Sequence, residues 1–244
     1  IDDMGSALTI TEASMINGMQ HLDIISHNLA NADTVGYKRE LAVTRPFSTY
    51  LLAAGMDGLR GVNPGLTKAT DFTIGASRHT SNPLDLAIEG DGYFVVESPQ
   101  GTLYTRQGNF TLDAAGYLVT TDGYRVAGEG GSMRLTSDQP RIDKEGVLWE
   151  AGEMVGRFKI ARFSDSRQLE KLGSGLFRAE ATVPLPETAM GPGLRQGFIE
   201  TSNVNGMNEM VDLIATMRQL EGGQKVIQGY SEMLDLAIQT IADI

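Results

Sequence analysis

The chain has 244 residues, a formal net charge of −11 and no cysteine. This length is enough for one large domain or two modest ones, and the 41% of hydrophobic residues is ordinary for a folded protein. The acidic charge disfavours binding to nucleic acid or to an anionic membrane. The lack of cysteine excludes disulfides, thiolate catalysis and cysteine-ligated metals.

The N-terminal segment lacks the features of a secretory signal. Residues 1–37 contain no lysine or arginine, whereas a signal peptide begins with a basic segment followed by an apolar run. No apolar run in the chain approaches the roughly 18 residues that a bilayer-spanning helix needs. We therefore expect neither a cleaved signal peptide nor insertion into a membrane.

The first predicted element is an amphipathic helix from about residue 4 to residue 31. Its apolar residues are spaced by three, four or seven positions, which is the period of one helix face. Residues 31–36 have the composition of a turn and are expected to end it. The residues expected to form its contact row are Leu8, Met15, Leu22 and Leu29.

The middle of the chain is predicted to be loose at first and then β-rich. In residues 37–81 short apolar patches alternate with glycine and proline, which indicates extended arms and loops. Short strands are predicted at 84–88, 93–97, 102–106, 117–120 and 157–162. The glycine-containing links expected to be hairpin turns are 90–92, 100–101, 115–116, 122–123 and 145–146. This pattern favours an antiparallel sandwich or barrel-like sheet, and residues 198–201 read as one last strand.

A second helix is predicted from Asn205, a good N-cap residue, to the end of the chain. Its apolar residues repeat every seven positions, which is typical of a helix that packs lengthwise against other helices. The row is Leu213, Leu220, Ile227, Leu234 and Ile241, flanked by Met210 and Met217. Gly222, Gly223 and Gly229 interrupt the pattern at about 1 kcal/mol each. They predict either a bend or the close approach of a neighbouring helix.

Together these elements predict an α+β fold in which long N- and C-terminal helices form a coiled-coil layer and an antiparallel all-β domain is inserted between them. The expected domains are a discontinuous helical core at 1–36 and 203–244, an extended connecting region at 37–81 and 191–202, and a β-rich outer domain at 82–190. We interpret the two helical rows as an assembly interface, because they are longer than a sheet of short strands can cover.

Candidate catalytic and metal sites are weak. Glu89 and Asp91 could form a carboxylate pair, but both flank glycines in a predicted turn. Residues 128–131 are glycine-rich yet lack the lysine and hydroxyl residue of a phosphate loop. His21, His27 and His79 are poorly spaced for a metal. We predict no catalytic residue, no cofactor and no metal site.

Four blocks of residues, at 24–38, 81–94, 104–118 and 200–218, combine helix-end, turn and strand residues in a fixed order. They closely resemble the signatures of bacterial flagellar rod and hook proteins, in the family's order. The residues that match are Asn28, Leu29, Asn31, Thr34, Gly36, Tyr37, Lys38, Leu84, Asp85, Gly90, Gly92, Phe94, Arg106, Gly108, Phe110, Gly116, Ser202, Asn203 and Val204.

The resemblance implies a non-enzymatic structural subunit of the flagellar basal-body rod, polymerising into the axial shaft that transmits torque from motor to hook. It implies copies of this chain, other proximal and distal rod proteins and adjacent ring components as partners, and the flagellar type III export apparatus in transit. It also implies a periplasmic location, reached without a cleaved signal peptide. The length is most similar to the proximal rod proteins, with a distal rod or hook-type axial protein as the alternative.

Two other classes of protein remain as alternatives. A periplasmic β-rich hydrolase with helical appendages would need converging carboxylates or a metal set. A binding module would use its helices only to dimerise. Open polymerisation would distinguish the rod hypothesis from both.

Overall fold

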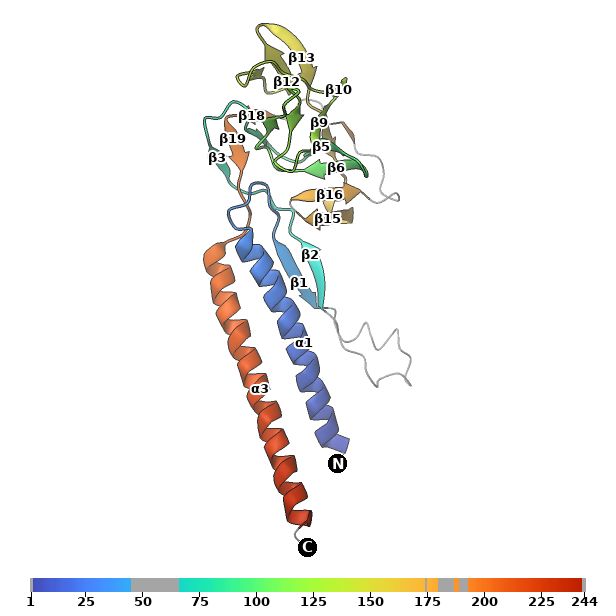
Figure 1. The fold of residues 1–244 in the computed structure, drawn as a ribbon, viewed down its shortest axis with the longest axis vertical. Helices are drawn as coiled ribbons and strands as arrows, with labels where there is room; N and C mark the ends of the chain where they lie inside the picture. Colours follow the sequence, from blue (N-terminus) through green and yellow to red (C-terminus); the bar gives the residue numbers. More distant parts are fainter. Residues whose placement is uncertain (1, 45–65, 174, 180–186, 189–192, 243–244) are drawn as a thin grey trace. The chain divides into compact units, whose positions relative to one another are not determined.

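The computed structural model describes residues 2–44, 66–173, 175–179, 187–188 and 193–242 (Figure 1). Side chains are described at 11–43, 66–173, 175–179 and 193–233. The described residues form two helices and many antiparallel strands, so the predicted α+β class is confirmed.

The chain divides into two compact units. Unit 1 comprises residues 1–30, 40–69 and 205–244, and unit 2 comprises residues 31–39 and 70–204. Residues 37–81 of the predicted connecting region are shared between the two units. The division into three domains therefore stays a prediction.

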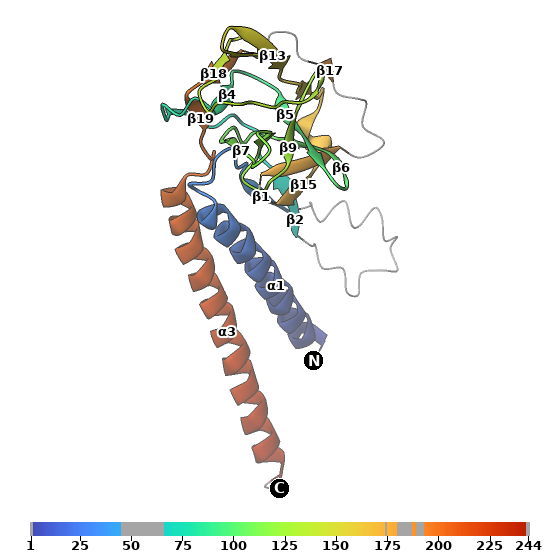
Figure 2. The same cartoon turned by 45° about the horizontal axis from the view of Figure 1, so that its top comes forward.

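Unit 1 is a helix pair with a short β-ribbon. Helix α1 (Asp2–Ala30) and helix α3 (Gly206–Ala242) lie side by side and antiparallel in both views (Figures 1 and 2). Strands β1 (Glu40–Thr44) and β2 (Leu66–Thr70) pair with each other, and β1 contacts α1. Among the described residues, no helix is both long enough and apolar enough to cross a membrane.

Helix α3 begins as its sequence predicts and continues through its glycines. Asn205 caps the helix, since its Oδ1 accepts hydrogen bonds from the backbone N–H groups of Met207 (3.1 Å) and Asn208 (3.2 Å). The helix is unbroken at Gly222, Gly223 and Gly229, and of the two predicted alternatives the close approach of a neighbouring helix is found at Gly223.

Glycines lie where the two helices touch. A Cβ atom added at Gly18 of α1 would lie 2.7 Å from Cδ2 of Leu220, and one added at Gly223 of α3 would lie 3.2 Å from Cγ of Met15. No described atom lies within 4 Å of a Cβ added at Gly222 or Gly229. The role of Gly223 is therefore close approach to α1, whereas Gly222 has open space above it.

Unit 2 is built around a ten-stranded antiparallel sheet of the described residues. Its strands are β5 (Tyr93–Ser98), β6 (Gly101–Thr105), β7 (Thr111–Leu112), β8 (Leu118–Val119), β9 (Arg125–Gly128), β10 (Gly131–Ser132), β14 (Ile160–Arg162), β15 (Leu169–Gly173), β16 (Leu176–Ala179) and β17 (Glu187–Thr188). A short 3₁₀ helix, η1 (Ser166–Gln168), precedes β15.

Three smaller sheets accompany the main one. They are β11 (Arg141–Ile142), β12 (Val147–Glu150) and β13 (Glu153–Arg157); β4 (Leu86–Ile88) with β18 (Leu194–Gln196); and β3 (Ser77–His79) with β19 (Phe198–Glu200). The predicted strand at 198–201 is thus confirmed. Its pairing with β3, more than a hundred residues earlier, joins the two ends of unit 2.

The core of unit 2 lies on both faces of the main sheet. Side chains alternate between faces along a strand, so Phe94 and Val96 of β5 enter one apolar cluster while Tyr93 and Val95 enter another. In the first cluster the ring of Phe94 meets that of Phe110 edge-on, with centroids 5.0 Å apart. Both faces of β5 are consequently buried.

Four of the predicted hairpin turns are confirmed and one is wrong. The links at 100–101, 115–116, 122–123 and 145–146 each join strands that pair with each other. The link at 90–92 does not, because β4 pairs with β18 while β5 pairs with β6, β9 and β14. Gly92 lies against Ile160, so this link carries the chain from one sheet to another.

Two further expectations differ from the structure. The strand predicted at 157–162 is divided, because β13 ends at Arg157 and β14 starts at Ile160. Side chains still alternate across the break, since Phe158 and Ile160 are buried and Lys159 between them is exposed. The segment 37–81 contains β1, β2 and β3, and the apolar patch at 51–52 lies outside the described residues.

Close packing at Gly18 can be tested with a matched glycine in open space. Gly222→Ala is expected to stabilise the helix by about 1 kcal/mol, because it reduces backbone freedom without a clash. Gly18→Ala is expected to destabilise the helix pair by about 1–2 kcal/mol, because Leu220 must move. Urea unfolding followed by helical circular dichroism measures both.

A double variant makes this test specific. Leu220→Ala provides room for the new methyl group, so Gly18→Ala should cost less in that background. Equal effects of Gly18→Ala and Gly222→Ala would contradict the close contact.

Candidate functional site

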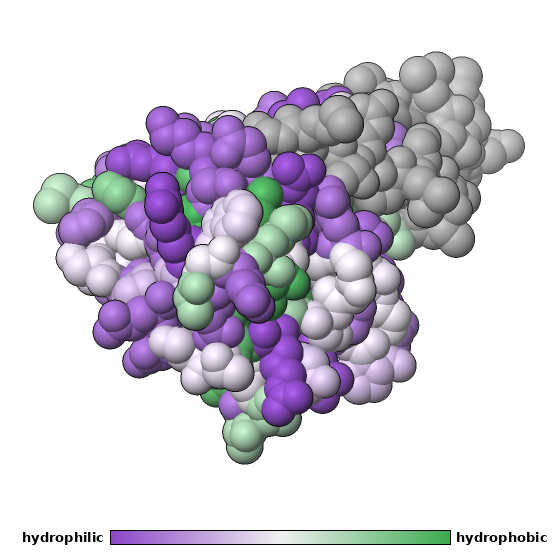
Figure 3. All heavy atoms as spheres, turned by 90° about the horizontal axis from the view of Figure 1, so that it is seen from above, coloured by the Kyte–Doolittle hydropathy of each residue, from purple (hydrophilic) through white to green (hydrophobic). Residues whose placement is uncertain are grey.

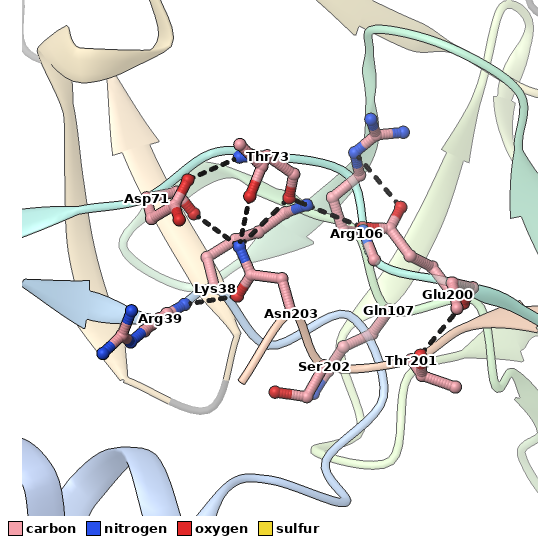
Figure 4. Close-up of polar contacts among 12 residues, drawn as sticks. Lys38, Arg39, Asp71, Thr73, Arg106, Gln107, Glu200, Thr201, Ser202 and Asn203 are labelled. Carbon is pink, nitrogen blue, oxygen red and sulfur yellow. Dashed lines mark hydrogen bonds and ion pairs between the residues drawn. The ribbon is translucent and has the colours of Figure 1, made fainter. Parts of the chain in front are cut away.

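Unit 2 contains a buried cluster of three charged side chains (Figure 4). Lys38 is fully buried, and its Nζ donates hydrogen bonds to Oε1 of Glu200 and to the backbone oxygen of Thr73, both at 2.6 Å. Arg106 lies on the other side of the carboxylate, with Nε 3.6 Å from Oε2 of Glu200. Burial lowers the pKa of Lys38, and the charge of Glu200 opposes that shift.

The three charges come from segments that are far apart in the sequence. Lys38 follows the turn after α1, Arg106 follows β6, and Glu200 ends β19 shortly before α3. Arg106 also donates from Nη2 to the backbone oxygen of Gly90 (2.6 Å). The cluster therefore joins the segment that leaves the first helix to the segment that enters the last one, through the body of unit 2.

Gly36 brings these segments into contact. Its N–H donates to the backbone oxygen of Glu200 (2.8 Å), and its φ of +65° lies in the left-handed region that favours glycine. A Cβ atom here would lie 2.6 Å from the backbone carbon of Arg106 and the backbone nitrogen of Gln107. Only a residue without a side chain permits this approach.

Asn203 extends the cluster with backbone contacts. Its Oδ1 accepts from the N–H of Arg39 (2.7 Å), and its Nδ2 donates to the backbone oxygens of Asp71 (2.9 Å) and Thr73 (3.1 Å) (Figure 4). The side-chain amide of Asn203 thus links Arg39 to the segment 71–73, and neither forms a strand pair with Asn203.

Tyr37 is buried beneath Lys171, whose Nζ lies 3.8 Å from the ring centroid.

Unit 1 has a corresponding polar centre at Asn28, which is 1% exposed. Its side-chain amide makes two hydrogen bonds of 2.8 Å with the backbone N–H and oxygen of Glu40. Its Nδ2 also lies 3.2 Å from Oε2 of Glu209, a buried carboxylate in the first turn of α3. Asn28 therefore joins α1, β1 and α3.

The residues predicted as an assembly interface are divided by the structure into two groups. Leu213, Leu220 and Ile227 are half-buried at a seven-residue spacing, and Leu220 lies over Gly18 of α1. Met210 and Met217 are exposed. On α1, the half-buried residues are Met15, Leu22 and Leu29. The side chains of Leu8, Leu234 and Ile241 lie outside those described.

A row of exposed apolar residues, the outer stripe, follows the first half of α3. It consists of Met207, Met210, Val211, Ile214 and Met217. Their spacing of three or four positions places them on one helix face, and each is 49% to 78% exposed. Figure 3 shows one face of the molecule, seen from above, on which hydrophilic side chains are interspersed with smaller apolar patches. Large exposed apolar patches are typical of surfaces that bind other proteins.

The other residues of the four sequence blocks lie in turns and in the core. In the turn after α1, the backbone N–H and the hydroxyl of Thr34 donate hydrogen bonds to the backbone oxygen and Oδ1 of Asn31. Near the start of α3, the backbone N–H of Val204 donates to Oγ of Ser202. Asp85 accepts from the Nδ2 of Asn82. Gly90, Gly92 and Gly116 have positive φ, and a Cβ at Gly92, Gly108 or Gly116 would collide with Ile160, Leu86 or Leu135 respectively. The buried apolar members are Leu84, Phe94 and Phe110.

The sequence did not reveal the hydrogen-bonding partners of Lys38 and Asn28. Glu200, Thr73, Glu40 and Glu209 were not predicted as site residues. Glu209 lies in the first turn of α3, where a carboxylate interacts favourably with the positive end of the helix, and it is buried against Asn28. One usable signal existed for Glu200, which ends the apolar strand Phe198–Glu200 with an acidic residue.

Comparison with known proteins matches three segments of the chain to protein families. Residues 15–38 match the family described as "Flagella basal body rod protein", residues 87–150 match "Flagellar hook protein FlgE/F/G D1 domain", and residues 195–240 match "Flagellar basal body rod FlgEFG protein C-terminal". Each matched segment contributes one charge to the buried cluster: Lys38, Arg106 and Glu200 respectively.

Whole-length relatives agree with these matches. The chain is 34% identical to the flagellar basal-body rod protein FlgG of Bacillus subtilis, over 91% of this chain and 95% of the relative. It is 32% identical to the rod protein FlgF of Caulobacter vibrioides, over 99% and 100%. It is 29% identical to FlgF of Mesorhizobium japonicum, over 98% of both.

The close approach at Gly36 predicts a large effect of a single methyl group. Gly36→Ala should destabilise unit 2 by at least about 2 kcal/mol more than Gly123→Ala, because its methyl group also overlaps the backbone of a neighbouring segment. Gly123 is the matched control, with φ +83° and no described atom within 4 Å of an added Cβ. Equal urea midpoints for the two variants would contradict the contact.

Breaking the buried ion pair should cost far more than breaking an exposed one. Lys38→Met leaves the carboxylate of Glu200 buried without its lysine partner, and is expected to lower the free energy of unfolding by about 3–5 kcal/mol. The control, Arg167→Met, breaks an exposed pair with Asp165 (2.9 Å) and should leave the urea midpoint unchanged.

The same variant tests how the ionisation of Lys38 makes the free energy of unfolding depend on pH. Because its pKa is lowered on folding, the folded chain releases this proton before the unfolded chain does. The stability of the wild type relative to Lys38→Met should therefore rise as pH increases toward the ordinary lysine value of 10.5. A fall over that range, measured by urea unfolding, would contradict the direction of the shift.

Proposed function

The chain belongs to the flagellar basal-body rod protein family, and we propose that it acts there as a structural subunit that joins its neighbours through its two helices. The family is structural rather than enzymatic and assembles the rod of the flagellar basal body. The observation that supports the use of the helices is the outer stripe, an apolar face of α3 that unit 1 leaves exposed.

We propose that α1 and α3 form one segment of a coiled-coil layer. The inner row, represented by Leu220 over Gly18, holds the two helices of one subunit together. The outer stripe is then available to other subunits. Burying each of its side chains would contribute about 1.5–3 kcal/mol. That gain would have to exceed the repulsion between acidic helices and the entropy lost on assembly.

Repeated contacts of this kind would generate a shaft. Contacts between unlike surfaces that do not close produce a helical polymer, and torque can pass along many parallel helix contacts. The buried cluster supports this role, because it ties together the segment that follows α1 and the segment that precedes α3. The pull on either segment would be shared by the ion pair of Lys38 and Glu200.

The position in the rod and the route to it are also proposals. The full-length alignment with FlgF of Caulobacter vibrioides supports the proximal rod, with the distal rod as the alternative because of the likeness to FlgG. We further propose export through the flagellar type III apparatus without a cleaved signal peptide, a periplasmic position, and contact with adjacent ring components. Family membership is the support for these statements.

A charge in the outer stripe should prevent assembly without unfolding the chain. Ile214 is 53% exposed, so Ile214→Asp is expected to leave circular dichroism unchanged. It should reduce the amount of this chain in purified basal bodies at least tenfold and abolish swimming, because the carboxylate would be buried on assembly.

The matched control introduces the same charge on an exposed residue outside the stripe. Gln219→Asp should assemble like the wild type. Normal incorporation of the Ile214→Asp chain would show that the outer stripe is not an assembly surface.

A further inference from the structure

We infer that the outer stripe of one copy docks into a hollow between α1 and β2 of the next copy, so that assembly is head to tail. The inference rests on the proposed function and specifies which two surfaces of unit 1 meet. Both surfaces are described within this unit, and they lie on different elements.

The hollow has the properties of a receiving site. It encloses about 350 Å³ between α1 and the start of β2, and its lining is Met19, Gln20, Asp23, Ile24, Leu66 and Lys68. Its rim includes Met19, which is 56% exposed, and Ile16 lies one turn away on the same side of α1. The hollow is therefore a mainly apolar depression with charged residues at its edge.

The outer stripe is a continuous row of large apolar side chains along one face of α3. From Met207 to Met217 it extends about 15 Å along α3 at 1.5 Å per residue. Its flexible methionines flank Val211 and Ile214, and such side chains adapt to an irregular hollow. We place Ile214, in the middle of the stripe, over Met19 of the next copy.

Charge also favours this pairing. The face of α1 around the hollow bears Glu12 and Asp23, and residues 1–37 contain no lysine or arginine. Arg218 and Lys225 are exposed and continue the face of the outer stripe, where the exposed Glu221 offsets one of these two positive charges. Docking of the stripe would bring the remaining positive charge toward an acidic helix face, although Lys68 already pairs with Asp23 at 2.7 Å.

The two surfaces point to an open contact rather than a closed one. Leu213 and Leu220 are half-buried on the side of α3 that faces α1. The residues of the outer stripe occupy the positions between them on the opposite side of the helix, so the stripe is turned away from α1. The hollow lies beside α1 at the β-ribbon. A stripe-to-stripe contact would close a dimer and leave the hollow empty, whereas stripe-to-hollow contacts leave one free surface at each end.

Cysteine cross-linking tests the inference, because the natural chain has no cysteine. Cells would carry the full-length variant Met19→Cys with Ile214→Cys in place of the natural chain, and basal bodies would be treated with a short bismaleimide. Denaturing gels should show a ladder of dimers and higher multiples. Cells carrying both single variants together should give dimers only, and each single variant alone should give no product.

A control and a second pair make the result decisive. Ser14→Cys with Ile214→Cys should give no ladder, since Ser14 is exposed on another side of α1. Gln20→Cys with Met217→Cys tests the same contact at different positions, and should give a ladder even where the first pair impairs incorporation.

Several outcomes would overturn the inference. They are dimers from Ile214→Cys alone, products that contain a different rod protein, and assembled rods in which neither pair gives a ladder. In these cases the chain is still present in the rod, so the proposed function stands. Absence of the natural chain from purified basal bodies would instead overturn the proposed function.

Discussion

The ion pair between Lys38 and Glu200 is the interaction on which the two ends of unit 2 depend. Removing charges from water costs several kcal/mol per ion, and close pairing offsets part of that penalty. Here the lysine is fully buried, contacts the carboxylate at 2.6 Å and is also satisfied by the backbone oxygen of Thr73. Arg106 adds a second cation on the far side of the carboxylate. Gly36 and Asn203 then fill the remaining contacts between the same segments.

A second constraint concerns the helices. A side chain of α3 that packs against α1 of the same chain cannot also be buried against another subunit. In α3 the half-buried row with Leu220 packs against the chain's own α1, and the outer stripe remains exposed. Gly18 and Gly223 allow the inner contact to be close. A buried amide at Asn28 completes unit 1 by connecting both helices to β1. The contacts that hold the two helices together and the exposed apolar residues therefore lie on different sides of α3.

Local sequence features were reliable where neighbouring residues decide the structure. The N-cap at Asn205 and the hairpin turns at 100–101, 115–116, 122–123 and 145–146 depend on residues within a few positions of each other, and they were predicted correctly. The turn at 90–92 has the same composition but connects different sheets, because the partner of β4 is β18, about a hundred residues later. Composition cannot reveal a partner at that distance.

The sequence by itself determined the α+β class, the two helices, most of the turns and, through four short blocks, the family of the protein. Only the tertiary structure decided which of the apolar helix residues face inward and which face out, and that Lys38, Arg106 and Glu200 meet in one buried cluster. The physical reason is that capping and turn formation depend on local backbone geometry, whereas burial and ion pairing depend on which distant segments are brought together.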